Sequence, residues 1–116
     1  MYKSIALLKA KPGMSREEFV HYYETRHAPL IRSLLPQIVE YRRNFIDLEG
    51  AYIFENASPP DFDVITEIWY RDRAAYEDMA AAVMQPEIAR QISEDEARFL
   101  DRSKTRMFVV DEKKSA

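Results

Sequence analysis

The sequence has no cysteine and only 2 glycines among its 116 residues. It therefore forms no disulfide, offers no thiolate nucleophile or cysteine-ligated metal site, and has too few glycines for a glycine-rich phosphate-binding loop. It also lacks a basic surplus, because 17 lysines and arginines are outnumbered by 20 aspartates and glutamates, which gives a net charge of -3. Proteins that bind nucleic acids draw much of their affinity from such a surplus, so we expect no nucleic-acid partner.

Long hydrophobic runs are absent as well. The apolar run Ile5–Leu8 is too short for the core of a signal peptide or for a membrane span. We therefore expect no membrane partner and a cytoplasmic protein. Hydrophobic residues make up 47% of the chain and charged residues 32%, which is typical of a globular protein. The length suits a single domain over residues 1–116 with a modest core.

The pattern of apolar residues predicts the order strand, helix, strand, strand, helix, strand. That order is the split βαβ arrangement of a ferredoxin-like α+β domain, in which helices cover one face of an antiparallel sheet. The strands are expected over residues 2–9, 38–46, 64–70 and 105–111, and the helical segments over 16–27, 28–35, 72–83, 86–92 and 93–100.

The predicted strands are apolar on both faces. A sheet that is covered by helices on one side should have a polar second face. Because the second face is apolar here, it must be covered, most economically by a second copy of the same sheet, and we expect a two-fold homodimer. The residues concerned are Ile5 and Leu7 against Ala6 and Leu8, and Ile65 and Trp69 against Val64 and Ile68.

The first predicted helix carries a histidine on its buried face. Ser15 with Glu18 three residues later is a capping box, which marks the start of this helix. Pro29 should break the helix near residue 28 and leave space and free backbone groups around His27. The surroundings of His27 are therefore the first place where we expect a catalytic site. The inward stripe is expected to contain Phe19, Tyr23, His27, Leu30 and Leu34.

The stretch from residue 47 to residue 63 has no regular pattern. It contains the apolar run Ala51–Phe54 and the breaker Pro59-Pro60. A connection of this length often forms a lid or a binding loop. In that case Tyr52 and Phe54 would close the cavity and contact the substrate. The same stretch is equally consistent with a hairpin extension or with an edge strand at a subunit contact.

Several stretches carry a family resemblance, namely Lys11–Phe19, Arg26–Leu30, Tyr41–Asn44, Phe62-Asp63 with Glu67–Trp69, and Asp95-Glu96 with Phe99 and Asp101. They are similar to the EthD family, named for ethyl tert-butyl ether degradation. The resemblance implies a ferredoxin-like protomer, a back-to-back sheet dimer known as a dimeric α/β barrel, and a cavity between sheet and helices. It implies less about the reaction, since members and relatives include polyketide cyclases, dehydratases, decarboxylases, lactone isomerases and cofactor-independent oxygenases.

His27 is the first candidate for catalysis. An imidazole titrates near neutrality, so it could act as a general acid–base or donate a hydrogen bond to an enolate or carbonyl oxygen. It could instead be a structural residue that satisfies the backbone beside Pro29, but the family resemblance favours a site. Tyr23 lies one turn earlier on the same face. It could orient His27, or it could be a core tyrosine with a bonded hydroxyl.

Glu67 is the second charged candidate, because it lies between apolar residues in a predicted strand. A buried carboxylate is costly without a partner. The partner could be Arg43 or Arg26 in an ion pair, which we slightly favour. Glu67 could instead be an acid of raised pKa in the cavity, paired with His27.

Tyr41 and Trp69 are further candidates for substrate binding. Tyr41 and Asn44 fall on opposite faces of one strand, so at most one of them faces the cavity. Trp69 could stack on an aromatic ligand. No metal site is expected, because His21 and His27 lie about 120° apart on a helix and cannot chelate together. We expect no cofactor either.

These observations predict a homodimer that binds a small molecule in one apolar cavity per protomer. The expected activity is cofactor-independent acid–base catalysis, of cyclase, dehydratase, isomerase, decarboxylase or oxygenase type, on an aromatic, polyketide-like or lactone substrate. His27 would transfer the proton, and Glu67 or Tyr23 would orient it. The alternative is a non-catalytic small-molecule-binding or accessory protein of a catabolic pathway.

Overall fold

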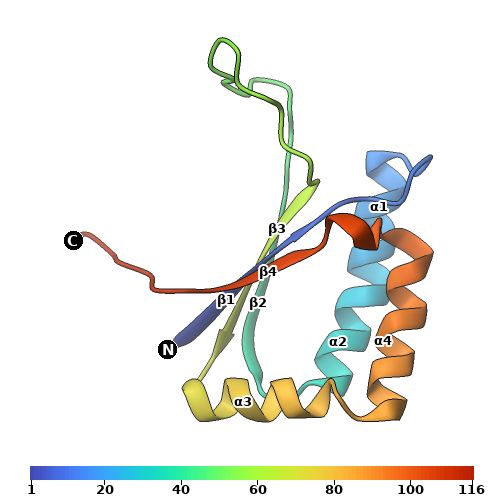
Figure 1. The fold of residues 1–116 in the computed structure, drawn as a ribbon, viewed down its shortest axis with the longest axis vertical. Helices are drawn as coiled ribbons and strands as arrows, with labels where there is room; N and C mark the ends of the chain where they lie inside the picture. The colour runs from blue at the N-terminus through green and yellow to red at the C-terminus, as the bar shows by residue number, and fades with distance from the viewer.

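The computed structural model describes residues 1–116 and contains a 4-stranded sheet with helices on one face (Figure 1). The strand order is β2-β3-β1-β4, and every neighbouring pair is antiparallel. This is the ferredoxin-like α+β topology, so the predicted fold of the protomer is confirmed. The elements are β1 Tyr2–Leu8, α1 Arg16–Tyr22, the π-helical turn η1 Tyr23–His27, α2 Ala28–Leu34, β2 Ile38–Phe45, β3 Val64–Tyr70, α3 Arg73–Ala82, α4 Pro86–Phe99, the 3-10 turn η2 Arg102–Lys104 and β4 Arg106–Val110.

Helix α1 begins at the predicted capping box. The Ser15 hydroxyl accepts a hydrogen bond from the Glu18 N–H at 3.1 Å, and the Glu18 carboxylate accepts one from the Ser15 N–H at 2.9 Å. Asp72 caps α3 by accepting from the Ala75 N–H at 2.8 Å. Each cap satisfies N–H groups that have no partner inside the first turn.

A π-helical turn replaces the helix break that we predicted before Pro29. The prediction of a break is wrong, because the backbone stays helical from α1 through η1 into α2 and Pro29 lies inside this continuous helix. A π-helical turn holds more residues than an α-helical turn, so it rotates the following residues around the helix. Ile31 and Leu35 therefore become buried. Leu30 and Leu34, which we expected on the inward stripe, are only half-buried.

Helix α4 is one continuous helix, so the predicted restart at Ser93 is wrong. Neither proline nor glycine interrupts the chain after Pro86. The inward residues keep helical spacing from one end to the other, and packing of that face outweighs the local capping signal. They are Ile88, Ile92, Asp95 and Phe99.

An irregularity in β2 changes which of its residues face the helices. The register against β3 shifts between Ile38 and Glu40, and such an extra residue turns the strand. Ile38 and Tyr41 are both buried as a result, while Val39 is exposed. Regular alternation along residues 38–46 predicts Ile38 and Tyr41 on opposite faces, and the extra residue makes that prediction wrong. β3 alternates without interruption, as predicted, and its buried face consists of Val64, Thr66, Ile68 and Tyr70.

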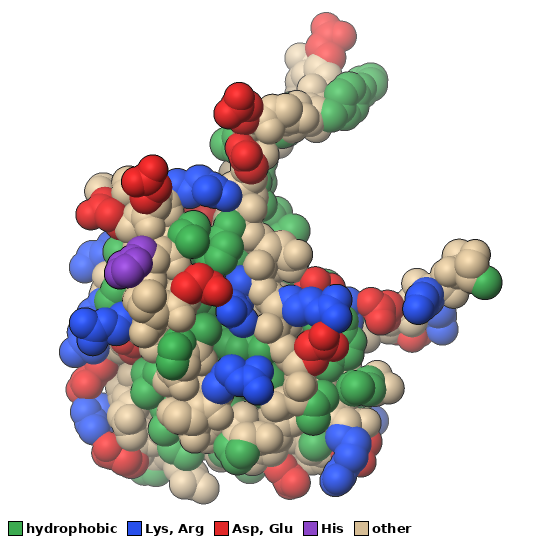
Figure 2. Space-filling model, turned by 180° about the vertical axis from the view of Figure 1, so that it is seen from behind, with side chains coloured by type: hydrophobic (Ala, Val, Ile, Leu, Met, Phe, Trp, Pro, Cys, Tyr) green, Lys and Arg blue, Asp and Glu red, His purple; other side chains and the backbone are tan.

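The stretch between β2 and β3 is irregular, as predicted. It projects beyond the end of the sheet, and both it and the chain after Val110 lean to the side away from the helices (Figures 1 and 2). Its apolar side chains Leu48, Tyr52 and Phe54 are exposed. No helix combines the length and the hydropathy that crossing a membrane would need.

Candidate functional site

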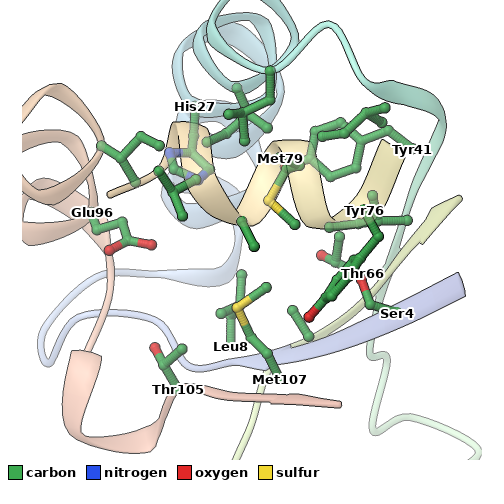
Figure 3. A pocket seen from close by; sticks show the side chains of 18 of the residues that line it. Ser4, Leu8, His27, Tyr41, Thr66, Tyr76, Met79, Glu96, Thr105 and Met107 are labelled. Carbon is green, nitrogen blue, oxygen red and sulfur yellow. The ribbon is translucent and has the colours of Figure 1, made fainter. Parts of the chain in front are cut away.

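A cavity of about 410 Å³ lies between the inner face of the sheet and the helices (Figure 3). Of the 23 residues that line it, 17 are hydrophobic, so its few polar groups are the ones that can orient a ligand. They form two clusters at opposite ends, with apolar residues such as Leu8, Met79 and Met107 between them (Figure 3). One end contains His27 and Glu96, and the other contains Ser4, Tyr41 and Thr66 (Figure 3).

His27 is held by an aspartate from the last helix. Its side chain lines the cavity although the residue is only 3% exposed. The Nδ1 atom lies 2.8 Å from Oδ2 of Asp95, which is 6% exposed. The other carboxylate oxygen, Oδ1, accepts a hydrogen bond from the Tyr22 hydroxyl at 2.6 Å. Tyr22, Asp95 and His27 therefore form one hydrogen-bonded chain that ends at the cavity.

The π-helical turn explains how Tyr22 and His27 reach the same carboxylate. In η1 the Ala28 N–H donates to the carbonyl of Tyr23, five residues earlier. In such a turn, residues five apart lie nearly above one another, whereas in an α-helix they point apart. The side chains of Tyr22 and His27, five residues apart, are thus brought to the side that faces Asp95.

The contact with Asp95 also determines which ring nitrogen of His27 is free. A carboxylate accepts hydrogen bonds and does not donate them, so Nδ1 carries the proton and Nε2 is left for a ligand. Burial lowers the pKa of His27, and Asp95 opposes part of that effect. The imidazole is therefore neutral at neutral pH, with its basic nitrogen available. This is the arrangement of a general base.

A cluster of hydroxyl groups lies across the same cavity from His27, and Tyr23 contacts both. The Tyr23 hydroxyl is 3.0 Å from the Tyr41 hydroxyl and 2.8 Å from Oγ1 of Thr66. Burial raises the pKa of Tyr23 and of Tyr41, so these groups stay neutral and can only exchange hydrogen bonds. The rings of Tyr23 and His27 pack edge to face at 5.4 Å between centroids. Tyr23 thus contacts His27 by packing, while its hydroxyl points to the cluster.

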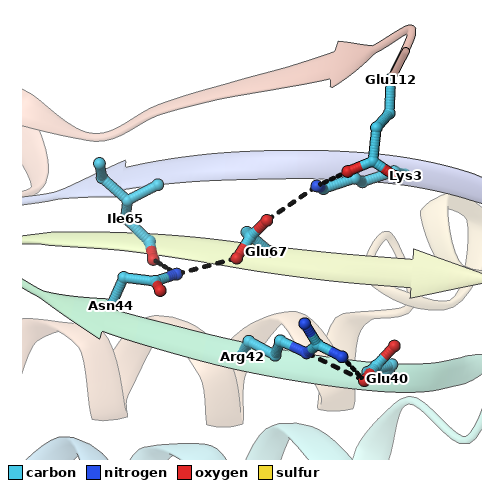
Figure 4. A network of polar contacts seen from close by, with 7 residues as sticks. All are labelled: Lys3, Glu40, Arg42, Asn44, Ile65, Glu67 and Glu112. Atoms are coloured by element: carbon cyan, nitrogen blue, oxygen red, sulfur yellow. Dashed lines mark hydrogen bonds and ion pairs between the residues drawn. The ribbon is translucent and has the colours of Figure 1, made fainter. Parts of the chain in front are cut away.

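Glu67 lies on the opposite face of the sheet (Figure 4). Its Oε1 atom is 2.7 Å from Nζ of Lys3, and Asn44 donates to its Oε2 atom at 3.0 Å. The hydrogen bond from Lys3 lowers the pKa of Glu67. The ion pair that we favoured therefore exists, but with Lys3 in place of Arg43 or Arg26. The pairing of Glu67 with His27 is not formed, because strand alternation directs Glu67 outward.

Trp69 lies on the same outer face as Glu67 and does not line the cavity. Nζ of Lys3 lies 4.4 Å from the centre of its ring, and Cζ of Arg42 lies 5.0 Å from it. The indole is thus placed between two cations and not against a ligand in the cavity. Of the pair Tyr41 and Asn44, Tyr41 lines the cavity and Asn44 faces outward, where it contacts Glu67.

Tyr52 and Phe54 lie on the projecting loop, where they are 82% and 68% exposed. Their rings contact each other at 6.4 Å between centroids. None of the residues that line the cavity comes from residues 46–63. Within the single chain this loop therefore does not close the cavity, contrary to our expectation. It extends past the end of the sheet and away from the helices (Figure 1).

Asp95 is the residue of this site that sequence reasoning missed. It takes the position beside His27 that we had considered for Glu67. A signal for it exists in the sequence, because Asp95 interrupts the apolar stripe of α4 between Ile92 and Phe99. A carboxylate on a buried stripe needs a partner, and His27 is the buried polar group that provides it here.

The protein is thus a ferredoxin-like protomer with a buried histidine–aspartate pair on an apolar cavity. The EthD domain model matches residues 11–103, and the chain belongs to the EthD family. No curated protein matches the chain. The structure contains no group of three or more histidine, cysteine, aspartate or glutamate side chains that could hold a metal ion.

Solved structures share the fold at low identity. A crystal structure of an Arabidopsis thaliana protein has 16% identity and a TM-score of 0.67, over 100% of this chain and 99% of its own. An ethyl tert-butyl ether degradation family protein from Bacillus halodurans has 18% identity and a TM-score of 0.63, over 97% and 100%. An antibiotic biosynthesis monooxygenase has 19% identity and a TM-score of 0.51, over 98% and 100%.

Proposed function

We propose that this protein binds an aromatic, polyketide-like or lactone molecule in the cavity and catalyses a proton transfer on it without a cofactor. The observation that carries the proposal is the buried pair of His27 and Asp95, in which Asp95 holds Nδ1 and the imidazole lines an apolar cavity. The volume of about 410 Å³ lies within the range of about 300–1,000 Å³ that is usual for small-molecule sites.

In the proposed reaction, Nε2 of neutral His27 removes a proton from a substrate carbon next to a carbonyl group. The electron pair of the broken C–H bond moves to the carbonyl oxygen and forms an enolate. Asp95 stabilises the imidazolium that results, as a carboxylate does for a catalytic histidine in general. Tyr22 holds Asp95 in place through its hydrogen bond of 2.6 Å.

The hydroxyl cluster is suited to the enolate oxygen. Tyr41 and Thr66 line the cavity, and Tyr23 links them. Fixed hydroxyl donors in a site that excludes water stabilise a developing negative charge. His27 then returns the proton to another carbon, which gives isomerisation, or to a departing hydroxyl group, which gives dehydration. Tyr23, whose hydroxyl bonds with the cluster, would orient His27 only by the packing of its ring, and Asp95 takes the role considered for Glu67.

The test uses 2-tetralone, an aromatic ketone with exchangeable protons beside its carbonyl group. NMR in deuterium oxide would follow the loss of those protons with the wild-type protein and with His27→Gln. We expect the wild type to accelerate exchange, and His27→Gln to lower that acceleration by about 10²–10⁴-fold. Equal exchange rates for the two proteins would refute proton transfer by His27. Binding without exchange would favour the alternative, a non-catalytic small-molecule-binding protein.

We also propose that the protein is a homodimer formed through the outer face of the sheet. Ile5 pairs with Phe108 and Glu67 across that face, and Phe108 is half exposed in the single chain. Large exposed apolar patches usually mark protein interfaces. The loop between β2 and β3, which carries the exposed Tyr52 and Phe54, leans to the same side of the sheet (Figure 1). The predicted location in the cytoplasm stays a prediction.

A further inference from the structure

The cavity contains polar groups that the proposed proton transfer does not use. Oγ1 of Thr105 is buried, lines the cavity and has no hydrogen-bond partner. A buried hydroxyl without a partner is costly, and native proteins leave few of them. An orphan hydroxyl on the wall of a ligand-sized cavity is therefore a sign that a ligand supplies the missing partner.

Glu96 lies at the same end of the cavity as Thr105 and His27 (Figure 3). Its side chain is 27% exposed, and its nearest cation is Arg102, with Nε 4.0 Å from Oε1. Burial raises the pKa of Glu96, Arg102 acts in the opposite direction, and Asp95 adds to the rise. No side chain donates a short hydrogen bond to this carboxylate. Glu96 is thus a second acceptor at the end of the cavity where His27 acts.

The far end of the cavity has an orphan hydroxyl of its own. Ser4 is 3% exposed and lines the cavity. Its Oγ atom has no well-formed hydrogen bond, although it lies near the hydroxyl of Tyr70. Ser4 and Thr66 are neighbours at this end in Figure 3. The two orphan hydroxyls therefore mark opposite ends of one apolar chamber.

We propose that Glu96 and Thr105 form a second polar subsite, and that the ligand is an apolar molecule with oxygen substituents at both ends. This inference rests on the proposed function and narrows its substrate class. A hydroxyl group at the His27 end donates to the Glu96 carboxylate and accepts from Thr105. A carbonyl or hydroxyl oxygen at the far end bonds with Ser4 and the hydroxyl cluster. The body of the molecule lies against Leu8, Met79 and Met107.

The test compares two probes that differ only in the second oxygen, 2,6-dihydroxynaphthalene and 2-naphthol. Isothermal titration calorimetry measures binding, since Trp69 lies outside the cavity and its fluorescence does not report occupancy. We expect the wild type to bind the diol about 10-fold more tightly, which is the effect of one or two well-placed hydrogen bonds. In Thr105→Val and in Glu96→Gln the ratio of the two affinities should fall to about 2-fold.

Two controls keep the result interpretable. Thr105→Val replaces a hydroxyl that has no protein partner, so its melting temperature should not fall below that of the wild type. Ser58→Ala removes a hydroxyl at an exposed position of the loop between β2 and β3 and should leave the ratio unchanged. A ratio that is the same in the wild type, Thr105→Val and Glu96→Gln would overturn the subsite alone. Failure of both probes to bind would overturn the proposed function and this inference with it.

Discussion

Replacement of Asp95 by asparagine tests the link between the buried pair and the chemistry. Asp95 accepts from Nδ1 of His27 at 2.8 Å and from the Tyr22 hydroxyl at 2.6 Å. An asparagine of the same shape can accept only through its oxygen, and its amide nitrogen must donate. If the Tyr22 hydroxyl keeps the oxygen, the amide donates to Nδ1. The proton of the imidazole then moves to Nε2, and the base in the cavity is lost.

The expected magnitude follows from the two effects of this substitution. The wrong tautomer removes general-base catalysis, so deuterium exchange of 2-tetralone should slow by about 10²–10⁴-fold. Loss of charge-assisted hydrogen bonds in a buried place should lower the free energy of unfolding by about 1–3 kcal/mol. Affinity for 2-tetralone should change little, because Asp95 does not line the cavity.

The assay combines the exchange rate, calorimetric affinity and urea unfolding for the same preparation. The matched control is Asp78→Asn on the exposed side of α3, which should leave all three quantities unchanged. Exchange by Asp95→Asn at the wild-type rate would refute the reasoning. If Asp95→Asn does not fold, it will lose its affinity for 2-tetralone. The exchange rate would then be measured for Asp95→Glu, which keeps a carboxylate acceptor.

Three further predictions concern pH, assembly and the hydroxyl cluster. The pKa of His27 is lowered in the folded state from its ordinary value of 6.5, so the unfolded state binds more protons as the pH falls through about 6.5. The free energy of unfolding should therefore decrease on acidification in that range, and the decrease should be smaller in His27→Gln; equal pH profiles in urea titrations would contradict this. Ile5→Glu places a charge in the centre of the outer face, so sedimentation should show a dimer for the wild type at micromolar concentration and a monomer for the variant, whereas a monomeric wild type would refute the dimer. Thr66→Val removes one partner of the Tyr23 hydroxyl, which is bonded at 2.8 Å, and should lower the free energy of unfolding by about 0.5–1.5 kcal/mol; thermal unfolding that matches the wild type would show that this bond contributes nothing.

Local rules were sufficient for much of the fold. The capping box at Ser15 and Glu18 and the alternation of β3 depend on residues that are close in sequence, and both appear as predicted. The four strands end within one residue of the predicted positions. The π-helical turn and the irregularity at Val39 were not predicted, because each inserts one residue relative to a regular period. Such insertions are stabilised by packing against other elements, which a local pattern does not contain.

The candidate site depends more on such distant contacts. His27 was predicted to face the cavity because helical spacing from Phe19 and Tyr23 places it there. Asp95 joins it from an element 68 positions away in sequence, and no spacing rule connects the two. Glu67 seemed a partner only while the face of β3 that meets the helices was undecided. The packing of the sheet against the helices decides on which face the Glu67 carboxylate lies, and the sequence of one strand does not contain that information.

Determining which ring nitrogen of His27 carries the proton would test the proposed general base most directly. The chain has 2 histidines, so nitrogen-15 NMR of the imidazoles can be assigned with the single variant His27→Gln. At neutral pH we expect a neutral His27 ring with its proton on Nδ1 and an unprotonated Nε2, and we expect saturating 2-tetralone to shift the Nε2 resonance. A ring that carries its proton on Nε2, or an Nε2 resonance that the ketone leaves unmoved, would contradict a general base in this cavity.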